Sequence, residues 1–194
     1  MKKLLLSISL IASAVLPSAA HAQAIPAAIV AVVDLEKVQS QCTACQAAQA
    51  ALRSQLTALQ NRSSSLAAPL QTEGKSIQAA VDALNGKEPD AALKARITAF
   101  ETKQQQGQQE LQRQQQQIQR NTAYISQQIQ TKLGPIYQQV MQRRGANVMI
   151  EQGATLASGA TLDVTNDVLT ALNAQLPSVQ TTAPAATQQQ TQGR

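Results

Sequence analysis

Two cysteines three residues apart are, by type, the residues of this chain best suited to chemistry. Cys42-Thr43-Ala44-Cys45 is a C-x-x-C motif. Dithiol oxidoreductases use this spacing and place the first cysteine at a helix N-terminus, where the dipole lowers the thiol pKa. An apolar repeat instead places both cysteines about two turns inside a helix, on its buried seam. Positions i and i+3 are near enough for a disulfide, although the side-chain directions are poor. We therefore predict core packing or a structural disulfide, with redox catalysis as the alternative.

The other candidates for chemistry are few. Asp163 and Asp167 could form a carboxylate pair, but they surround an expected helix start, where capping explains both. The only histidine, His21, lies in a segment that we expect to be removed. The mature chain would then lack a histidine-activated nucleophile and the commonest zinc ligand. We predict no catalytic residue, no metal site and no cofactor, and we expect that the protein is not an enzyme.

Residues 1–22 have the features of a secretory signal peptide. Lys2 and Lys3 precede an apolar run over 4–16, and Ala20-His21-Ala22 supplies the small residues needed for cleavage. The run is too short to span a membrane. We expect export to the periplasm, where nucleic acid is not an expected partner. Loss of the two lysines lowers the formal net charge from +5 to +3, and this mild basic excess favours acidic or anionic partners.

An apolar stripe with a 3.5-residue repeat dominates the chain. It contains Leu35, Val38, Cys42, Cys45, Gln49, Leu52, Leu56, Leu59, Ser63, Leu66, Leu70, Glu73, Ile77, Ala80 and Leu84. A repeat held this long indicates one helix, from 35 to 84, that lies along a partner helix. A second stripe over 93–140 follows a turn at 85–90. We therefore predict an antiparallel coiled-coil hairpin arm over 36–145, with its tip near that turn.

Two features of the arm predict departures from a regular hairpin. Pro69 and Gly134-Pro135 should kink the two helices. The second stripe is also weak at positions that are polar or glycine, namely Gln104, Gly107, Gln114 and Asn121. Such a seam predicts a loosely held, flexible arm. The glutamine run over 104–117 fits a solvated helical face, and the scattered aromatics Phe100, Tyr124 and Tyr137 fit seam packing or anchoring of a partner.

Short strand patterns lie at both ends of the hairpin, where they can meet at its base. The β-branched run at 28–33 predicts a buried strand, and Asp34 should cap the helix after it. Further strands are expected at 147–151 and 154–157. The fold class expected is therefore mainly α with a small β part.

These strands join a helix at 166–176, with Thr165 as its N-cap, in a β body made of residues 23–35 and 146–176. A body of this size buries too little apolar surface to be stable alone. We therefore expect several copies to share one sheet or barrel. Beyond the body, residues 177–194 are rich in Pro, Thr, Ala and Gln without periodicity, which predicts a disordered tail.

Three segments, in this order, resemble the Skp/OmpH family of periplasmic chaperones for outer-membrane proteins. They are IVAVVDLEKV at 29–38, ANVMIE at 146–151 and LDVTNDVL at 162–169, and the resemblance extends over 28–176. It implies a homotrimer in which strands of three copies form a central barrel and three arms surround a cavity. Members of that family hold unfolded outer-membrane proteins in the cavity without ATP.

The charge pattern departs from that of the better-studied members of the family, whose arm tips are strongly basic. Here the tip is formally neutral, and the positive charge lies lower on the arm. This basic band comprises Arg53, Arg62, Arg113, Arg120 and Lys132, continued by Arg143 and Arg144, with only Glu110 opposing. Pairing about the turn should bring Arg53 near Arg120 and Arg62 near Arg113. We predict that the band attracts acidic unfolded clients, anionic lipid or lipopolysaccharide; a solvated helical flank is the alternative.

The sequence thus favours an ATP-independent periplasmic holdase that binds unfolded outer-membrane proteins between helical arms and prevents their aggregation. The alternative is a structural coiled-coil envelope protein without chaperone activity. That protein would space or anchor surface components and would show no preference for unfolded chains.

Overall fold

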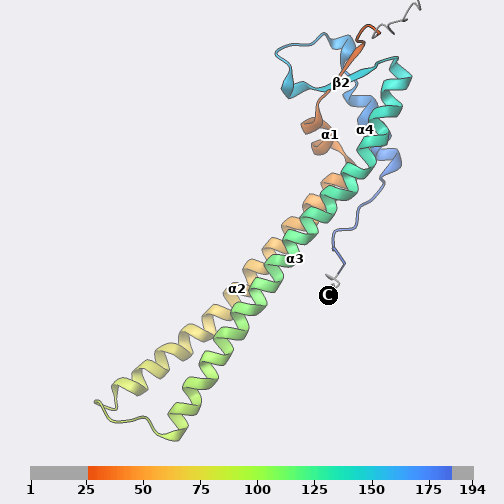
Figure 1. Cartoon of the computed structure of the whole chain (residues 1–194). Coiled ribbons are helices and arrows are strands. Elements are labelled where there is room, and N and C mark those ends of the chain that lie inside the picture. The colour runs from red at the N-terminus through yellow and green to blue at the C-terminus, as the bar shows by residue number, and fades with distance from the viewer. Residues whose placement is uncertain (1–25, 185–194) are drawn as a thin grey trace, which may run out of the picture.

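The computed structural model describes residues 26–184 and shows a long helical hairpin attached to a small body (Figure 1). In chain order its elements are β1 (Val30–Val33), α1 (Leu35–Gln41), α2 (Thr43–Asp82), α3 (Ala91–Arg144), β2 (Val148–Glu151), the 3-10 helices η1 (Gln152–Ala154) and η2 (Ala160–Leu162), and α4 (Thr165–Gln175). The expected class, mainly α with a small β part, is confirmed. The predicted signal peptide, residues 1–22, lies outside the described residues.

The body contains a parallel pair of strands that lie far apart in the chain. β1 and β2 pair from Val30 opposite Val148 to Val33 opposite Glu151. Parallel strands need a crossover connection, and here the whole hairpin arm is that connection. The hydrophobic core lies where β1, α1 and α4 pack on the base of α3. Its fully buried side chains include Val38, Cys42, Ile136, Val140, Val168 and Leu172.

The predicted third strand at 154–157 is wrong. η1 covers Gln152–Ala154, and the chain is irregular from there to η2. Leu156, within this stretch, is fully exposed. The far end of the loop returns to β1 through a single bridge between Val32 and Asp163. A strand forms only where a sheet edge accepts it, and the edge of β1 available in this protomer is used by that bridge.

The cap predicted at Asp34 is present, Asp90 also caps its helix, and the cap predicted at Thr165 is absent. Asp34 Oδ1 accepts a 2.8 Å hydrogen bond from Lys37 N, as expected, and Asp90 Oδ1 accepts one of 2.7 Å from Leu93 N. Thr165 does not cap α4 as predicted: Val164 occupies the cap position, and Asp163 Oδ1 accepts from Thr165 N at 2.8 Å.

The hydroxyl of Thr165 has a different role. Its Oγ1 accepts a 2.9 Å hydrogen bond from Asp34 N. The end of β1 is thereby tied to the start of α4, two segments 131 residues apart. The Thr165 side chain, which was expected to cap its own helix, instead joins two segments of the body.

The hairpin turn forms where the sequence placed it. Asn85 and Gly86 adopt left-handed backbone with φ of 50° and 84°, a conformation that glycine tolerates without strain. The two limbs of the arm, α2 and α3, then pair along the seam so that Leu66 lies opposite Gly107. A Cβ built on Gly107 would lie 3.6 Å from Leu66 Cδ1.

The prediction of one unbroken first helix is wrong. Cys42 has an extended backbone, with ψ of 123°, and separates α1 from α2. The proline positions do not break their helices, since α2 contains Pro69 and α3 contains Pro135. Figure 1 shows α3 curving where its teal segment reaches the body.

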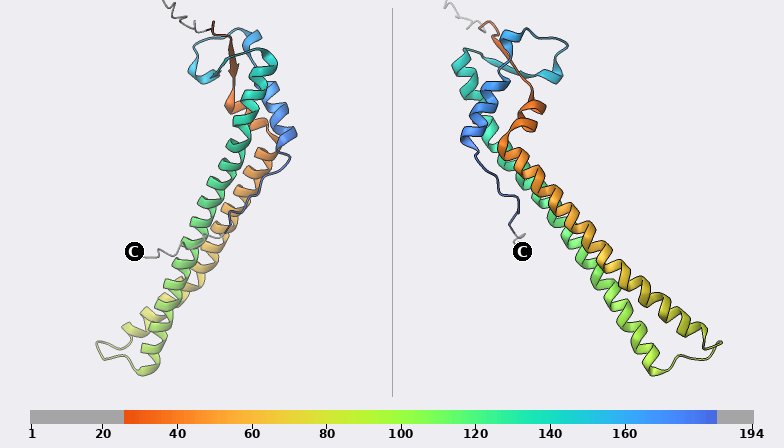
Figure 2. Two further views of the ribbon diagram at one scale, coloured as in Figure 1. Left: turned by 45° about the vertical axis from the view of Figure 1, so that its right-hand side comes forward. Right: turned by 180° about the vertical axis from the view of Figure 1, so that it is seen from behind.

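The segment 177–184 also differs from its prediction. Its composition indicated disorder, yet it leaves α4 and runs beside the arm without forming a helix or strand (Figures 1 and 2). Hydrogen bonds to side chains of both limbs hold it there. We call this segment the tail; residues 185–194 lie outside the described part of the chain.

Candidate functional site on the arm

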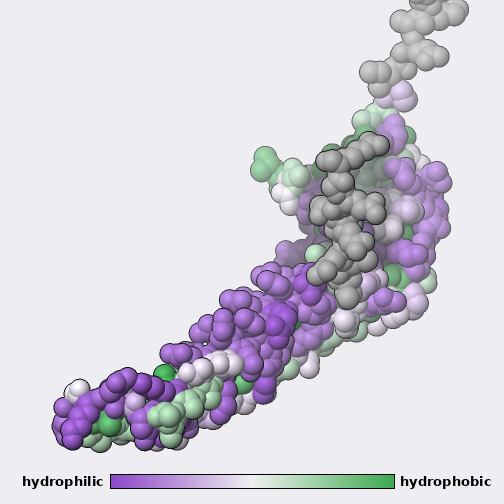
Figure 3. All heavy atoms as spheres, turned by 60° about the horizontal axis from the view of Figure 1, so that its bottom comes forward, coloured by the Kyte–Doolittle hydropathy of each residue, from purple (hydrophilic) through white to green (hydrophobic). Residues whose placement is uncertain are grey.

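The arm, rather than a closed pocket, carries the candidate functional surface. Within residues 26–184, no cluster of His, Cys, Asp or Glu side chains is placed to hold a metal ion. Shallow grooves lie along the α2–α3 seam. One groove of about 320 Å³ is lined by Arg62, Leu66, Leu70, Gly107 and Glu110, among others. Figure 3 shows that the visible face of the arm is mostly hydrophilic, with hydrophobic patches toward the tip.

The rim of this groove is closed by a two-pronged ion pair between the limbs. Arg62 Nε and Nη2 donate to Glu110 Oε1 and Oε2 at 2.7 and 2.8 Å. Hydrogen bonding lowers the pKa of Glu110 and raises that of Arg62, so both groups stay charged at neutral pH. Arg62 was predicted to add to a free basic band near Arg113. Its charge is instead matched by Glu110, because their side chains extend toward each other across the seam.

The remaining residues of the predicted band keep their cationic ends at the surface. Arg53, Arg113, Arg120 and Lys132 are all exposed. Arg120 donates to the side-chain carbonyl of Gln117, a neutral partner. Arg144, at the base, pairs with Asp167 at 2.5 Å, so Glu110 is not the only opposing carboxylate. The free positive charge of the band is therefore smaller than the sequence count.

Two ion pairs join charged side chains near the tip. Arg96 Nε donates to Glu73 Oε1 at 2.6 Å, which lowers the pKa of Glu73. Lys94 Nζ lies 2.5 Å from Glu88 Oε1. Part of the charge at the tip is thus matched within the chain, and the Arg96–Glu73 pair joins α3 to α2.

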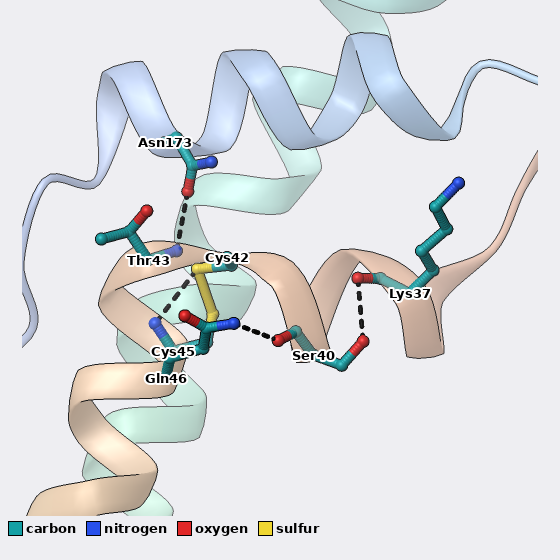
Figure 4. Close-up of a disulfide and its surroundings, with 7 residues drawn as sticks. All are labelled: Lys37, Ser40, Cys42, Thr43, Cys45, Gln46 and Asn173. Atoms are coloured by element: carbon teal, nitrogen blue, oxygen red, sulfur yellow. Dashed lines mark hydrogen bonds between the residues drawn. A yellow bond between two sulfur atoms is a disulfide. The ribbon is translucent and has the colours of Figure 1, made fainter.

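The two cysteines lie at the break between α1 and α2, joined by a disulfide (Figure 4). Cys42 caps α2, and its Sγ accepts a 3.1 Å hydrogen bond from Cys45 N. The sequence placed Cys42 two turns inside a helix, which is wrong; a helix start is the location that dithiol enzymes use. However, Cys42 and Cys45 are only 0% and 4% exposed. An attacking thiol must reach a sulfur atom, so this burial disfavours the oxidoreductase alternative.

The break also has a contact of its own to the body. Thr43 N, the first amide of α2, donates a 2.9 Å hydrogen bond to Asn173 Oδ1 of α4 (Figure 4). The free amides at a helix start need such partners. The junction between arm and body is therefore fixed by a cap, a disulfide and a contact from α4.

A set of side-chain amides on the arm was not recognised from the sequence. Gln117, Asn121 and Gln128 of α3, with Gln55 of α2, hydrogen-bond to the tail. Asn121 is 3% exposed, and its Nδ2 donates to Gln55 Oε1 at 2.8 Å. The available signal was the spacing of 117, 121 and 128, which places these residues on one face of a helix. This spacing was hard to recognise because glutamine is also common at the neighbouring positions on other faces of the helix.

The three aromatic residues also have distinct surroundings. Phe100 packs across the seam, with its ring 3.3 Å from where a Cβ of Gly74 would lie. Tyr137 packs against the body core, and burial raises the pKa of its hydroxyl. Tyr124 donates a 3.0 Å hydrogen bond to Gln180 Oε1 of the tail. Each therefore has a partner within the chain.

Comparisons with known proteins agree on one family. The family of outer membrane proteins described as OmpH-like matches residues 29–172, and no curated protein matches the chain. A candidate outer membrane chaperone (OmpH-like) from Caulobacter crescentus CB15 has a similar crystal structure, with a TM-score of 0.66. That similarity covers 81% of this chain and 90% of the other at 18% identity, and shows a common fold.

None of the described helices contains an apolar stretch long enough to cross a membrane. The family match takes in the strand before the arm, the whole hairpin, the second strand and most of α4. It therefore includes the arm as well as the three segments on which the resemblance in sequence rested. This chain belongs to the OmpH-like family.

Proposed function

We propose that the protein is an ATP-independent holdase chaperone that binds unfolded outer-membrane proteins and prevents their aggregation. The observation that carries this proposal is the match to the OmpH-like family over 29–172. The candidate outer membrane chaperone with the same fold supports it. The arm suits such a role because its grooves are shallow and combine leucine side chains with polar rims. Many weak contacts of this kind give avidity while each contact remains reversible.

The proposal includes a homotrimer built through the body. A two-stranded sheet is marginal on its own, and both β1 and β2 have an edge that lacks a full partner strand in the protomer. Large apolar side chains are exposed nearby, namely Ile29, Val148, Leu156 and Leu162. Contiguous exposed apolar surface commonly marks an interface. Strands from three copies sharing a barrel would cover these residues and orient three arms around one cavity.

The basic band would contribute a long-range attraction. Arg53, Arg113, Arg120 and Lys132 are exposed cations on the arm. Exposed charges steer an oppositely charged partner toward a binding surface. We propose acidic segments of unfolded clients as that partner, with anionic lipid or lipopolysaccharide as a second ligand of the same surface. The proposed location is the periplasm, reached through the signal peptide at 1–22.

A direct test combines aggregation and mass measurements. A urea-unfolded outer-membrane β-barrel protein is diluted into buffer with or without the mature protein, and light scattering follows its aggregation. Size-exclusion chromatography with light scattering gives the mass of the protein and of any complex. We expect a trimer that suppresses scattering at stoichiometric ratio and forms a soluble complex without ATP. Unchanged aggregation would refute the holdase and favour the structural coiled-coil alternative.

A further inference from the structure

The hydrogen bonds between the tail and the arm are made mainly to the tail backbone, while the Val179 side chain packs against the body core. Gln128 Nε2 donates to the carbonyl of Gln180 at 2.9 Å, and Gln128 Oε1 accepts from Gln180 N at 2.9 Å. One side-chain amide thus binds both polar backbone groups of one residue. This arrangement imitates the pairing of two peptide groups in a sheet, with a glutamine side chain in place of the second strand.

The same pattern recurs nearer the tip. Asn121 Oδ1 accepts from Ala183 N at 2.8 Å, and Gln117 Nε2 donates to the carbonyl of Ala183 at 3.2 Å. From the other limb, Gln55 Nε2 donates to the carbonyl of Thr181 at 3.2 Å. Backbone groups of three tail residues are therefore bound by side-chain amides of α2 and α3.

The chemistry of these contacts is independent of the tail sequence. Every residue except proline offers the same backbone N–H and C=O groups. Among the described contacts, only the hydrogen bond from Tyr124 to Gln180 Oε1 uses a polar side chain of the tail. A surface that binds backbone groups in this way would accept any polypeptide segment that is extended enough to present them.

The spacing of the amides fits an extended chain. Asn121 and Gln128 are seven residues apart, which is roughly 10.5 Å along a helix. Ala183 and Gln180 are three residues apart, and three residues of extended chain reach about 10 Å. Two helical turns therefore match three residues of bound chain. Gln114 lies another seven residues toward the tip, and it lines a groove of about 320 Å³ beside Thr182.

We propose that this amide face, made of Gln55, Gln114, Gln117, Asn121 and Gln128, is a sequence-independent binding site for an extended segment of unfolded polypeptide. The tail at 177–184 occupies it as a tethered competitor that an arriving client displaces. The inference deepens the proposed holdase function and rests on it for the identity of the natural ligand. It assigns an amide-rich part of the arm to client binding, next to the basic band, whose Arg120 donates a hydrogen bond to Gln117.

The decisive variants change the tail and leave the arm intact. In the full chain, Gln180→Pro with Ala183→Pro removes the two backbone donors that bind Gln128 and Asn121. The matched control, Gln180→Ala with Ala183→Ser, changes the same positions but keeps both donors. Binding of a fluorescently labelled, urea-unfolded outer-membrane β-barrel protein is then measured for the proline variant, the control and the unaltered protein.

We expect the proline variant to bind the client several-fold more tightly than the unaltered protein, because it no longer competes with itself. The control should bind within twofold of the unaltered protein. Adding Gln128→Ala to the proline variant should reverse the gain, since the amide that binds the backbone is gone. Equal client affinity for the proline variant and its control would overturn the inference while leaving the holdase function intact.

A second readout does not depend on client capture. A synthetic peptide with the sequence of residues 177–184, and a scrambled version of it, are added to the proline variant. NMR follows the side-chain amide signals of Gln128 and Asn121. Both peptides should shift these signals to a similar extent, whereas the same peptides should shift them little in the unaltered protein. No shift with either peptide would refute the amide face, whether or not the protein acts as a holdase.

Discussion

Asn121 Nδ2 donates a 2.8 Å hydrogen bond to Gln55 Oε1 and so joins α3 to α2 at a polar point of the seam. The Oδ1 atom of the same amide accepts from Gln117 and from Ala183 of the tail. A polar residue at a seam position was expected to loosen the hairpin. Because its amide is satisfied on both sides while only 3% exposed, it instead specifies how the two limbs meet.

Asn121→Leu should destabilise the hairpin although leucine suits a coiled-coil seam. The substitution leaves Gln55, Gln117 and the Ala183 amide without their partner, and an unsatisfied buried polar group costs about 1–3 kcal/mol. Urea unfolding followed by circular dichroism would measure the loss. The exposed Gln115→Leu, six residues away on the same helix, is the control and should change little. A more stable Asn121→Leu variant would show that the network is incidental.

Breaking the Cys42–Cys45 disulfide should weaken the junction of arm and body without unfolding the arm. A crosslink that closes so short a loop contributes about 2 kcal/mol in the chain-entropy account. The Cys42→Ser/Cys45→Ser variant should therefore unfold at lower urea, by an amount that a reducing agent reproduces in the unaltered protein. If the variant and the reduced protein were as stable as the oxidised one, the disulfide would not contribute to the stability of the junction, and the Thr43–Asn173 contact would be enough to hold it.

The effect on client binding of substituting an arginine of the basic band should depend on whether that arginine already has an acidic partner. Arg53→Glu, Arg113→Glu and Arg120→Glu together should weaken binding of an acidic unfolded client and flatten its salt dependence. Arg62→Gln should have a smaller effect on client binding, because Glu110 already neutralises that side chain. Affinities measured at low and high salt give both quantities. Equal client binding by the triple variant and the unaltered protein would exclude a role for the band.

Protonation of Asp163 at low pH should weaken its hydrogen bonds with Thr165 and so lower the stability of the body. Hydrogen bonds from the Thr165 side chain and backbone lower the pKa of this carboxyl below its ordinary value of 3.8. The stabilisation is thus fully present above pH 3.8 and is lost as the pH falls through the lower, folded-state pKa. Asp163→Asn should be slightly less stable than the unaltered protein at pH 6, by less than about 1 kcal/mol at this largely exposed site.

The difference between the two proteins should vanish at a pH below the folded-state pKa. Urea titrations at several pH values would show the convergence. A constant difference across that range would mean that the charge of Asp163 does not matter and that only its shape does.

The regularity of the repeat made the hairpin predictable, whereas interruptions of it were hidden. The turn at Gly86 and the cap at Asp90 are local signals, so both limbs could be placed from the sequence. The break at Cys42 could not, because a small apolar residue there satisfies the seam and the helix start equally well. The pattern at 154–157 resembles a strand, but pairing depends on an edge that the sequence does not describe.

The candidate site likewise has features that could be predicted from the sequence and features that could not. Exposed arginines were recognisable as a group by charge, but the pairing of Arg62 with Glu110 depends on which side chains meet across the seam. The amide face escaped notice because glutamine and asparagine bind by geometry and carry no charge. The tail was judged from its own composition, and its order comes from residues of the arm 52–126 positions away.

The parallel pairing of β1 with β2 also favours one order of folding. Ile29 and Asn147, at the start of that pairing, are 118 residues apart, and closing so long a loop from an unfolded chain is entropically unfavourable and slow. Formation of the hairpin removes most of this cost, since local helical contacts bring the two ends of the arm together first. β1 must therefore wait until nearly the whole chain has been made before it can pair with β2.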